Sequence, residues 1–131
     1  MGANANRKGA SGEREFAAIL ADGFPERTFM RNTYEQRWRG GSDVVGLDGF
    51  SIEVKRYAAG DWYQVGWWRQ VCEEATKTST IPVLAFRYDR KPWRIVVPAE
   101  WVMNEPLHNP IDRALVMDVD MFLELVKARN G

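Results

Sequence analysis

The stretch that decides the fold runs from residue 43 to residue 55 and reads Asp-Val-Val-Gly-Leu-Asp-Gly-Phe-Ser-Ile-Glu-Val-Lys. At its centre, Asp48-Gly49 is a strong signal for a two-residue turn. An apolar run precedes this turn and an alternating run follows it. The stretch therefore predicts a β-hairpin, with one strand at 44–47 and a return strand at 50–55.

The two faces of the return strand differ in chemistry, because side chains alternate along a strand. The apolar side chains share one face, and they are Phe50, Ile52 and Val54. Glu53 and Lys55 are neighbours on the opposite face. Asp43 stands at the mouth of the other hairpin strand, directly after Gly40-Gly41-Ser42, where glycines allow a close approach of the backbone. Two carboxylates and one ammonium are therefore expected to converge at this edge.

Helices and strands alternate in the rest of the chain. Before the hairpin, the pattern predicts a helix capped by Ser11 and ending at Asp22-Gly23, a short strand at 28–30 and a loop at 31–42. After the hairpin it predicts a helix at 62–78 and two strands at 81–88 and 93–97. A short helix at 99–103, an irregular segment at 104–117 and an amphipathic helix at 118–129 are expected to follow. This order predicts a single α/β domain over residues 1–131, with a mixed central β-sheet flanked by helices and a flexible arm at 1–8.

Composition narrows the class of protein. The 131 residues, 45% of them hydrophobic, suffice for a core without disulfides. No apolar run is long enough to span a membrane, and the polar start is not expected to be a signal peptide. The single Cys72 excludes an intramolecular disulfide and a multi-cysteine zinc site. We expect it to pack in the core of a cytoplasmic protein (host cytoplasm if the source is viral).

The charge of the chain does not decide whether its binding partner is a nucleic acid. The formal net charge is zero, but residues 1–94 carry a net charge of +3 and residues 95–131 one of −3. Four arginines lie close together in the first part, at positions 27, 31, 37 and 39. They predict either a basic patch that contacts phosphates or ordinary loop charges. Trp62, Trp67 and Trp68 are expected to be core or dimer-interface residues rather than a stacking surface.

The expected cluster suits the hydrolysis of a phosphodiester bond. Mg²⁺ takes oxygen ligands and keeps several waters, so one or two carboxylates, a backbone carbonyl and a substrate phosphate suit it. The metal activates water and stabilises developing charge. Lys55 would orient that water, offset phosphate charge or act as a base. Taken alone, Glu53 and Lys55 would more simply be an ion pair on the solvated face of a strand. The prediction of a metal site therefore depends on Asp43 and on the glycine turn before it.

A third carboxylate comes from the first helix. Glu13 extends the apolar stripe of Ala17 and Leu20, so its side chain could reach over the sheet edge and complete the metal shell. The simpler alternative is a first-turn glutamate favoured by the helix dipole. Glu15 lies off the stripe and is expected to be solvated.

Three runs together resemble a known superfamily. They are Arg7-Lys8-Gly9-Ala10-Ser11-Gly12-Glu13-Arg14-Glu15-Phe16, Gly41-Ser42-Asp43-Val44-Val45 and Ile52-Glu53-Val54-Lys55. In order and spacing they resemble the archaeal Holliday-junction resolvases and related phage-type endonucleases of the PD-(D/E)XK superfamily. The resemblance touches roughly residues 7–97. It implies a restriction-endonuclease-like core, a homodimer and a branched-DNA substrate of DNA recombination.

The resemblance also implies roles for single residues. Glu13 matches the helix glutamate of the family, Asp43 its metal aspartate, and Glu53 and Lys55 its E-x-K pair. Gln64 or Gln70 matches the glutamine that follows this strand in related nucleases, and Gln70 is favoured. Residues 31–42 are longer than the usual stretch before the aspartate in that family, and the tail after Val97 has no correspondence in it.

We therefore predict a Mg²⁺-dependent DNA endonuclease, in which Mn²⁺ can substitute. Its catalytic residues are Glu13, Asp43, Glu53 and Lys55. Its metal ligands are Asp43, Glu53, Glu13 and the Val54 carbonyl. The side chains expected to contact DNA are Arg7, Lys8, Arg31, Arg37, Arg39, Ser42 and Gln70. The alternatives are a nuclease for duplex, flap or single-stranded DNA, a non-catalytic DNA-binding module of the same fold, and an assembly protein.

Overall fold

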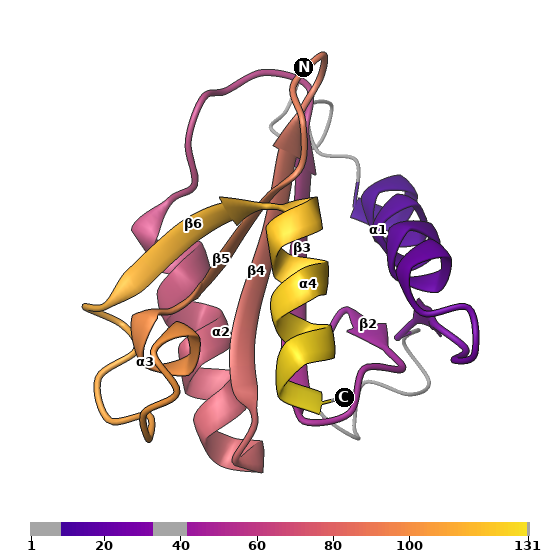
Figure 1. Cartoon of the computed structure of the whole chain (residues 1–131). Coiled ribbons are helices and arrows are strands. Elements are labelled where there is room, and N and C mark those ends of the chain that lie inside the picture. Colours follow the sequence, from indigo (N-terminus) through magenta and orange to yellow (C-terminus); the bar gives the residue numbers. More distant parts are fainter. Residues whose placement is uncertain (1–8, 33–41, 131) are drawn as a thin grey trace.

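The computed structural model describes residues 9–32 and 42–130 (Figure 1). The helices are α1 (Gly9–Gly23), α2 (Val65–Thr78), α3 (Ala99–Val102) and α4 (Val119–Asn130). The strands are β1 (Met30–Arg31), β2 (Val44–Val45), β3 (Phe50–Tyr57), β4 (Ile81–Tyr88), β5 (Arg94–Pro98) and β6 (Ala114–Asp118). The predicted arm at 1–8 and most of the predicted loop at 31–42 lie outside the described residues.

Four strands form a mixed sheet in the order β3-β4-β5-β6. β3 and β4 are parallel and pair without a break from Phe50 opposite Ile81 to Tyr57 opposite Tyr88. β4 with β5, and β5 with β6, are antiparallel. The parallel pair is joined through α2, because parallel neighbours need a long crossover connection. This mixed sheet with helices on its faces confirms the predicted α/β class.

Helices cover both faces of the sheet, with α4 and α2 on opposite faces in Figure 1. On one face, α1 and α4 bury an apolar layer that includes Phe16, Leu20, Phe122, Val126 and the β3 residues Phe50, Ile52 and Val54. On the other face, α2 contributes Trp67, Trp68, Val71 and Cys72, which pack against Leu84, Phe86, Tyr88 and Val96. The alternation of β3 therefore turns Glu53 and Lys55 toward the α2 face. They lie opposite the apolar side chains of the strand, and this separation of the two faces is what the sequence predicted.

The seating of α1 on β3 depends on Gly12. A Cβ atom at this position would lie 2.4 Å from the Cβ of Arg56. The absence of a side chain therefore lets the helix approach the strand closely. The helix begins at Gly9, so Ser11 lies inside it and the predicted cap at that residue is wrong.

The predicted hairpin is wrong in its pairing. β2 pairs with β1, with Met30 opposite Val45, and not with the strand that follows the turn. The reason lies at Gly46, whose φ is +128° and where a Cβ atom would lie 2.3 Å from the Thr28 carbonyl oxygen. The backbone there lies against the residues before β1. The turn itself forms, since the Phe50 N–H donates to the Leu47 carbonyl at 3.4 Å.

The carboxy-terminal part differs from the predicted pattern in one element. Asp118 Oδ1 accepts a hydrogen bond from the Met121 N–H at 2.8 Å, so Asp118 caps the last helix. Met121 lies on this helix and is 49% exposed. Residues 104–117 were expected to be irregular, yet they contain most of β6. Among residues 9–32 and 42–130, no helix combines the length and apolar character that crossing a bilayer requires.

Candidate active site

Asp43 is buried and fastened to the edge of β3 that β4 does not occupy. Its N–H donates to the Ile52 carbonyl at 2.6 Å, and its Oδ2 accepts from the Val54 N–H at 2.8 Å. Ser42 holds the same edge, because its hydroxyl accepts from the Ile52 N–H at 2.9 Å and donates to the Val44 carbonyl at 2.7 Å. Asp43 thereby bonds to both chain neighbours of Glu53.

The Val54 carbonyl faces this edge as well. The N–H and C=O of one residue in a strand point to the same side, as Ile52 shows by donating to Ser42 and accepting from Asp43. Because the Val54 N–H meets the Asp43 carboxylate, its carbonyl lies along the same edge. One carboxylate and one backbone oxygen are thus presented side by side.

Glu53 and Lys55 form a buried ion pair on the α2 face. Lys55 Nζ lies 3.5 Å from Glu53 Oε2, and both side chains are more than nine-tenths buried. The same Nζ lies 6.0 Å from the centre of the Trp67 ring, which stacks on Tyr57 at 5.3 Å. A buried ammonium requires a charged or π-electron partner, and it has both. The pair is therefore not the solvated strand pair of the simpler interpretation.

Glu13 approaches from the opposite face of the sheet. It is buried on the stripe of α1 that also carries Phe16, Ala17 and Leu20. Its Oε1 accepts a hydrogen bond of 2.9 Å from Arg31 Nε, and Arg31 pairs with Val44 between β1 and β2. The helix has no acidic residue in its first turn, so the interpretation of Glu13 as a first-turn glutamate does not hold.

The oxygen atoms near Asp43 can be compared with the ligands that Mg²⁺, the metal predicted from the sequence, prefers. Within the described ranges, no group of three or more His, Cys, Asp or Glu side chains is placed to hold a metal ion. Mg²⁺ needs no such cage, since it is commonly held by one or two carboxylates with waters and substrate phosphate. Asp43, Glu53 and the Val54 carbonyl supply hard oxygen donors of that number and kind, so they fit Mg²⁺. A share of Glu13 in the metal shell stays a prediction.

A second polar network ties α1 to the sheet, and it corrects one expectation. Glu15 was expected to be solvated, but its Oε1 accepts from Trp93 Nε1 at 2.8 Å and from Arg87 Nη1. Arg87 is the register partner of Arg56, whose Nη1 lies 2.6 Å from Asp89 Oδ1. No local sequence pattern indicates this network, because Arg87 and Trp93 lie more than seventy positions from Glu15 along the chain, and its third partner, Arg56, lies in β3.

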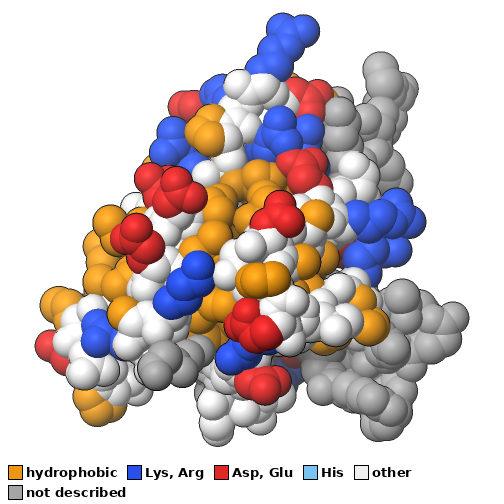
Figure 2. All heavy atoms as spheres, turned by 45° about the vertical axis from the view of Figure 1, so that its right-hand side comes forward, with side chains coloured by type: hydrophobic (Ala, Val, Ile, Leu, Met, Phe, Trp, Pro, Cys, Tyr) orange, Lys and Arg blue, Asp and Glu red, His pale blue; other side chains and the backbone are white. Residues whose placement is uncertain are grey.

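The residues predicted to contact DNA fall into three groups. Arg7, Lys8, Arg37 and Arg39 lie outside the described residues. Arg31 is paired with Glu13, and the Ser42 hydroxyl is bonded to backbone. Gln70 is exposed on α2. Figure 2 brings the α1 side forward and shows charges of both signs interspersed, so the described residues make no continuous basic surface on that face. All seven DNA contacts stay predictions.

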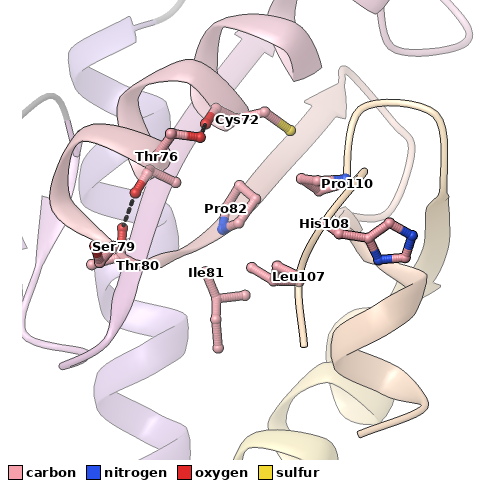
Figure 3. A pocket seen from close by; sticks show the side chains of 10 residues that line it. Cys72, Thr76, Ser79, Thr80, Ile81, Pro82, Leu107, His108 and Pro110 are labelled. Atoms are coloured by element: carbon pink, nitrogen blue, oxygen red, sulfur yellow. Dashed lines mark hydrogen bonds between the residues drawn. The ribbon is translucent and has the colours of Figure 1, made fainter. Parts of the chain in front are cut away.

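A hollow of about 390 Å³ lies elsewhere, between the end of α2, the start of β4 and residues 107–110 (Figure 3). The two threonine hydroxyls that line it are already bonded, that of Thr76 to the Cys72 carbonyl at 2.9 Å and that of Thr80 to the Ser51 hydroxyl at 2.6 Å. Burial raises the pKa of the Cys72 thiol to about 12, so this thiol is not a nucleophile near neutral pH. The hollow is therefore not a second candidate for the chemistry.

The other polar centre beside this hollow is structural. His108 Nδ1 lies 2.7 Å from Oε2 of the fully buried Glu100, which also accepts the His108 and Asn109 N–H groups at 2.9 Å. Burial by itself raises the pKa of Glu100, but these two N–H donors and the charges of His108 and Arg113 hold it below its usual value. The carboxylate therefore fastens residues 108–109 to α3. The His108 side chain is thereby held against Glu100, away from Asp43, Glu53 and Lys55.

A mixed four-stranded sheet flanked by helices is the architecture of a restriction-endonuclease-like core. Over residues 4–122 the chain matches the family described as phage putative PDDEXK endonuclease. The chain therefore belongs to this family of the PD-(D/E)XK superfamily, whose nucleases generally use divalent metal ions. The match includes every predicted site residue and extends past Val97, where the resemblance of the sequence motifs ended. The curated proteins contain no match to this chain.

Proposed function

We propose that this protein is a Mg²⁺-dependent endonuclease that hydrolyses phosphodiester bonds of DNA, with Asp43, Glu53 and Lys55 at its centre. One observation carries the proposal. Asp43 is bonded to the Ile52 carbonyl and to the Val54 N–H, which flank Glu53 on both sides. The proposal is supported by this bonding, because it holds Asp43 against the strand that carries the Glu53–Lys55 pair.

The chain's own residues have distinct roles in this proposal. Asp43, Glu53 and the Val54 carbonyl would hold the metal, and Mn²⁺ would be accepted in its place. When bound, the metal supplies water activation and stabilisation of developing negative charge. Lys55 Nζ, held 3.5 Å from Glu53 and against Trp67, donates hydrogen bonds to the attacking water or to a phosphate oxygen. Glu13, fixed by Arg31, supports the metal or its water from the α1 side.

We further propose branched DNA as the first substrate to test, and a twofold homodimer in the cytoplasm (the host's, if the source is viral). A twofold dimer would present two sites to opposite strands of a symmetric junction. The support for this finer assignment is the motif resemblance to junction resolvases. Duplex ends, flaps and single strands are the competing substrates, and the same assay includes them.

The test is a cleavage assay on four-way, flap, duplex and single-stranded DNA, with Mg²⁺ and with EDTA. We expect cleavage with Mg²⁺ and none with EDTA. Lys55→Ala should lower the cleavage rate by about 10²–10⁴-fold, the usual loss for a proton-transfer or water-positioning group, while DNA binding in EDTA is retained. Circular dichroism checks that this variant folds, because Lys55 is buried.

The matched control is Lys77→Ala, because Lys77 is a lysine of α2 with a 71% exposed side chain, paired only with Glu74 three residues before it among the contacts of the described chain. It should cleave like the parent protein. A parent protein that binds DNA but cuts none of the four forms with Mg²⁺ would instead be a DNA-binding module. A parent without any salt-sensitive DNA affinity would contradict both readings and favour the assembly protein.

A further inference from the structure

Trp62 is a large aromatic side chain that the fold leaves 52% exposed. Its position is nevertheless fixed. Its carbonyl accepts a hydrogen bond of 2.6 Å from the Tyr88 hydroxyl, and its ring meets Phe86 edge-on, with 5.8 Å between ring centres and an angle of 78°. Tyr63 supports the same ring at 5.7 Å. A rigid aromatic ring is therefore held from within the protein and open toward solvent.

This ring lies beside the candidate active site. Phe86, which it contacts, is the register partner of Lys55 in the parallel pair of β3 and β4. Register partners in neighbouring strands point to the same face and lie about 4.8 Å apart. Trp62 is thus separated from Lys55 by a single side chain, on the α2 face where the Glu53–Lys55 pair lies.

The surface next to Trp62 continues along the first turns of α2. Val65 is exposed, and a Cβ atom added at Gly66 would meet nothing within 4 Å. Arg69 is exposed and stands one helical turn after Val65, so the two side chains share a stripe of the helix. Trp62 therefore precedes by three residues an exposed apolar side chain, Val65, which shares one stripe of α2 with the exposed cation of Arg69.

We propose that Trp62 stacks against an unpaired DNA base, while Arg69 contacts the phosphate backbone of the same strand. The proposal rests on the proposed nuclease function and narrows its substrate. Bases inside a continuous duplex are covered on both faces by their neighbours, so they offer no face to the ring. Aromatic stacking accepts any base, because every base has a π face. The site therefore selects DNA by an unstacked nucleotide near the cut, as in single strands, flaps and junctions, and not by sequence.

The test measures binding of the full chain to oligothymidylate and to a duplex of equal length, in EDTA so that nothing is cut. Trp62→Ala should weaken oligothymidylate binding by about 5- to 140-fold, which corresponds to the usual 1–3 kcal/mol of one stacked base. Trp62→Phe keeps a stacking ring and should retain most of the affinity. Duplex affinity should not change in either variant. Arg69→Gln should weaken binding to oligothymidylate and reduce its salt dependence.

Met121→Ala is the matched control, because Met121 is exposed to the same extent on α4, on the other face of the sheet. It should leave both affinities unchanged. Tryptophan fluorescence gives an independent readout, since oligothymidylate should quench the parent more than Trp62→Phe. Equal affinity and equal quenching in the parent and the Trp62 variants, with Mg²⁺-dependent cleavage present, would overturn the stacking inference alone. A parent protein that neither binds nor cuts DNA would overturn the nuclease proposal as well.

Discussion

Asp43 and Val54 are joined by a hydrogen bond of 2.8 Å in which a strand N–H donates to a carboxylate oxygen. The same carboxylate is the proposed metal ligand. One side chain thus has a structural role and a chemical role, and two substitutions separate them. Asparagine keeps an acceptor oxygen and loses the charge, whereas alanine loses both.

Asp43→Asn should therefore remove Mg²⁺-dependent cleavage and leave the free energy of unfolding close to that of the parent. Asp43→Ala should remove cleavage and in addition lower the free energy of unfolding by about 1–3 kcal/mol, because the Val54 N–H is left buried without its acceptor. Urea unfolding without metal measures the difference. Equal stability of the two variants would show that the hydrogen bond contributes nothing to the fold.

Two glycines inside helices should respond in opposite directions to alanine. At Gly12 the new methyl group would meet Arg56 Cβ at 2.4 Å, so α1 must shift, and we expect a loss of about 1–3 kcal/mol. At Gly66 a Cβ atom meets nothing within 4 Å, so Gly66→Ala should stabilise by about 0.5–1 kcal/mol through helix propensity alone. The midpoints of urea unfolding compare them. A stable Gly12→Ala protein would contradict the close contact of α1 with β3.

Glu100 should make the fold sensitive to acid. Its folded-state pKa is held below the ordinary 4.5, so folding favours the ionised form. Its stabilising effect is therefore complete above about pH 4.5 and is lost as the pH falls through the lower folded pKa. Glu100→Gln should cost about 1–3 kcal/mol at neutral pH and should flatten the acid limb of the stability profile.

The control for this experiment is Glu105→Gln, because Glu105 also lies near Arg113, at 3.8 Å, but is half exposed. Its stability profile should follow that of the parent protein. Urea unfolding at a series of acidic pH values gives both profiles. An unchanged acid limb in Glu100→Gln would mean that other carboxylates govern the acid sensitivity.

Cys72 should be inert to thiol reagents in the folded protein. Burial, with the carboxylates of Glu100 and Glu73 adding to it, raises its pKa to about 12. Only the thiolate reacts, and at about pH 8 roughly one such thiol in 10⁴ is ionised. Iodoacetamide should label the native chain far more slowly than the chain in urea. Fast labelling of the native protein would show that the α2 layer opens readily.

Much of the fold follows from local pattern. β4 has the predicted bounds, because an apolar run between turn signals is read without knowledge of its neighbours. The pairing of Val44–Val45 could not be read in the same way. Asp48-Gly49 does turn the chain, but β3 takes β4 as its neighbour and β2 takes β1. Turn chemistry determines where a chain reverses, and it does not determine which strands then pair.

The candidate site likewise has some features that local sequence pattern predicts and others that depend on packing between distant parts of the chain. The shared face of Glu53 and Lys55 follows from strand alternation, and the burial of Glu13 follows from its place on the apolar stripe of α1. The contacts of Glu15 with Arg87 and Trp93 depend on the packing of α1 against distant strands, so no local pattern indicates them. β6 was missed because its side chains are only partly buried and show no clean alternation.

The edge of β3 that faces away from β4 has a consequence beyond chemistry. A bare strand edge offers its amides to any passing chain and is a starting point for intermolecular sheet growth. Here the amides of Ile52 and Val54 are already bonded to the side chains of Ser42 and Asp43. The aspartate that would hold the metal therefore also shields this edge, so Asp43→Ala should raise the tendency of the protein to aggregate, whereas Asp43→Asn should not.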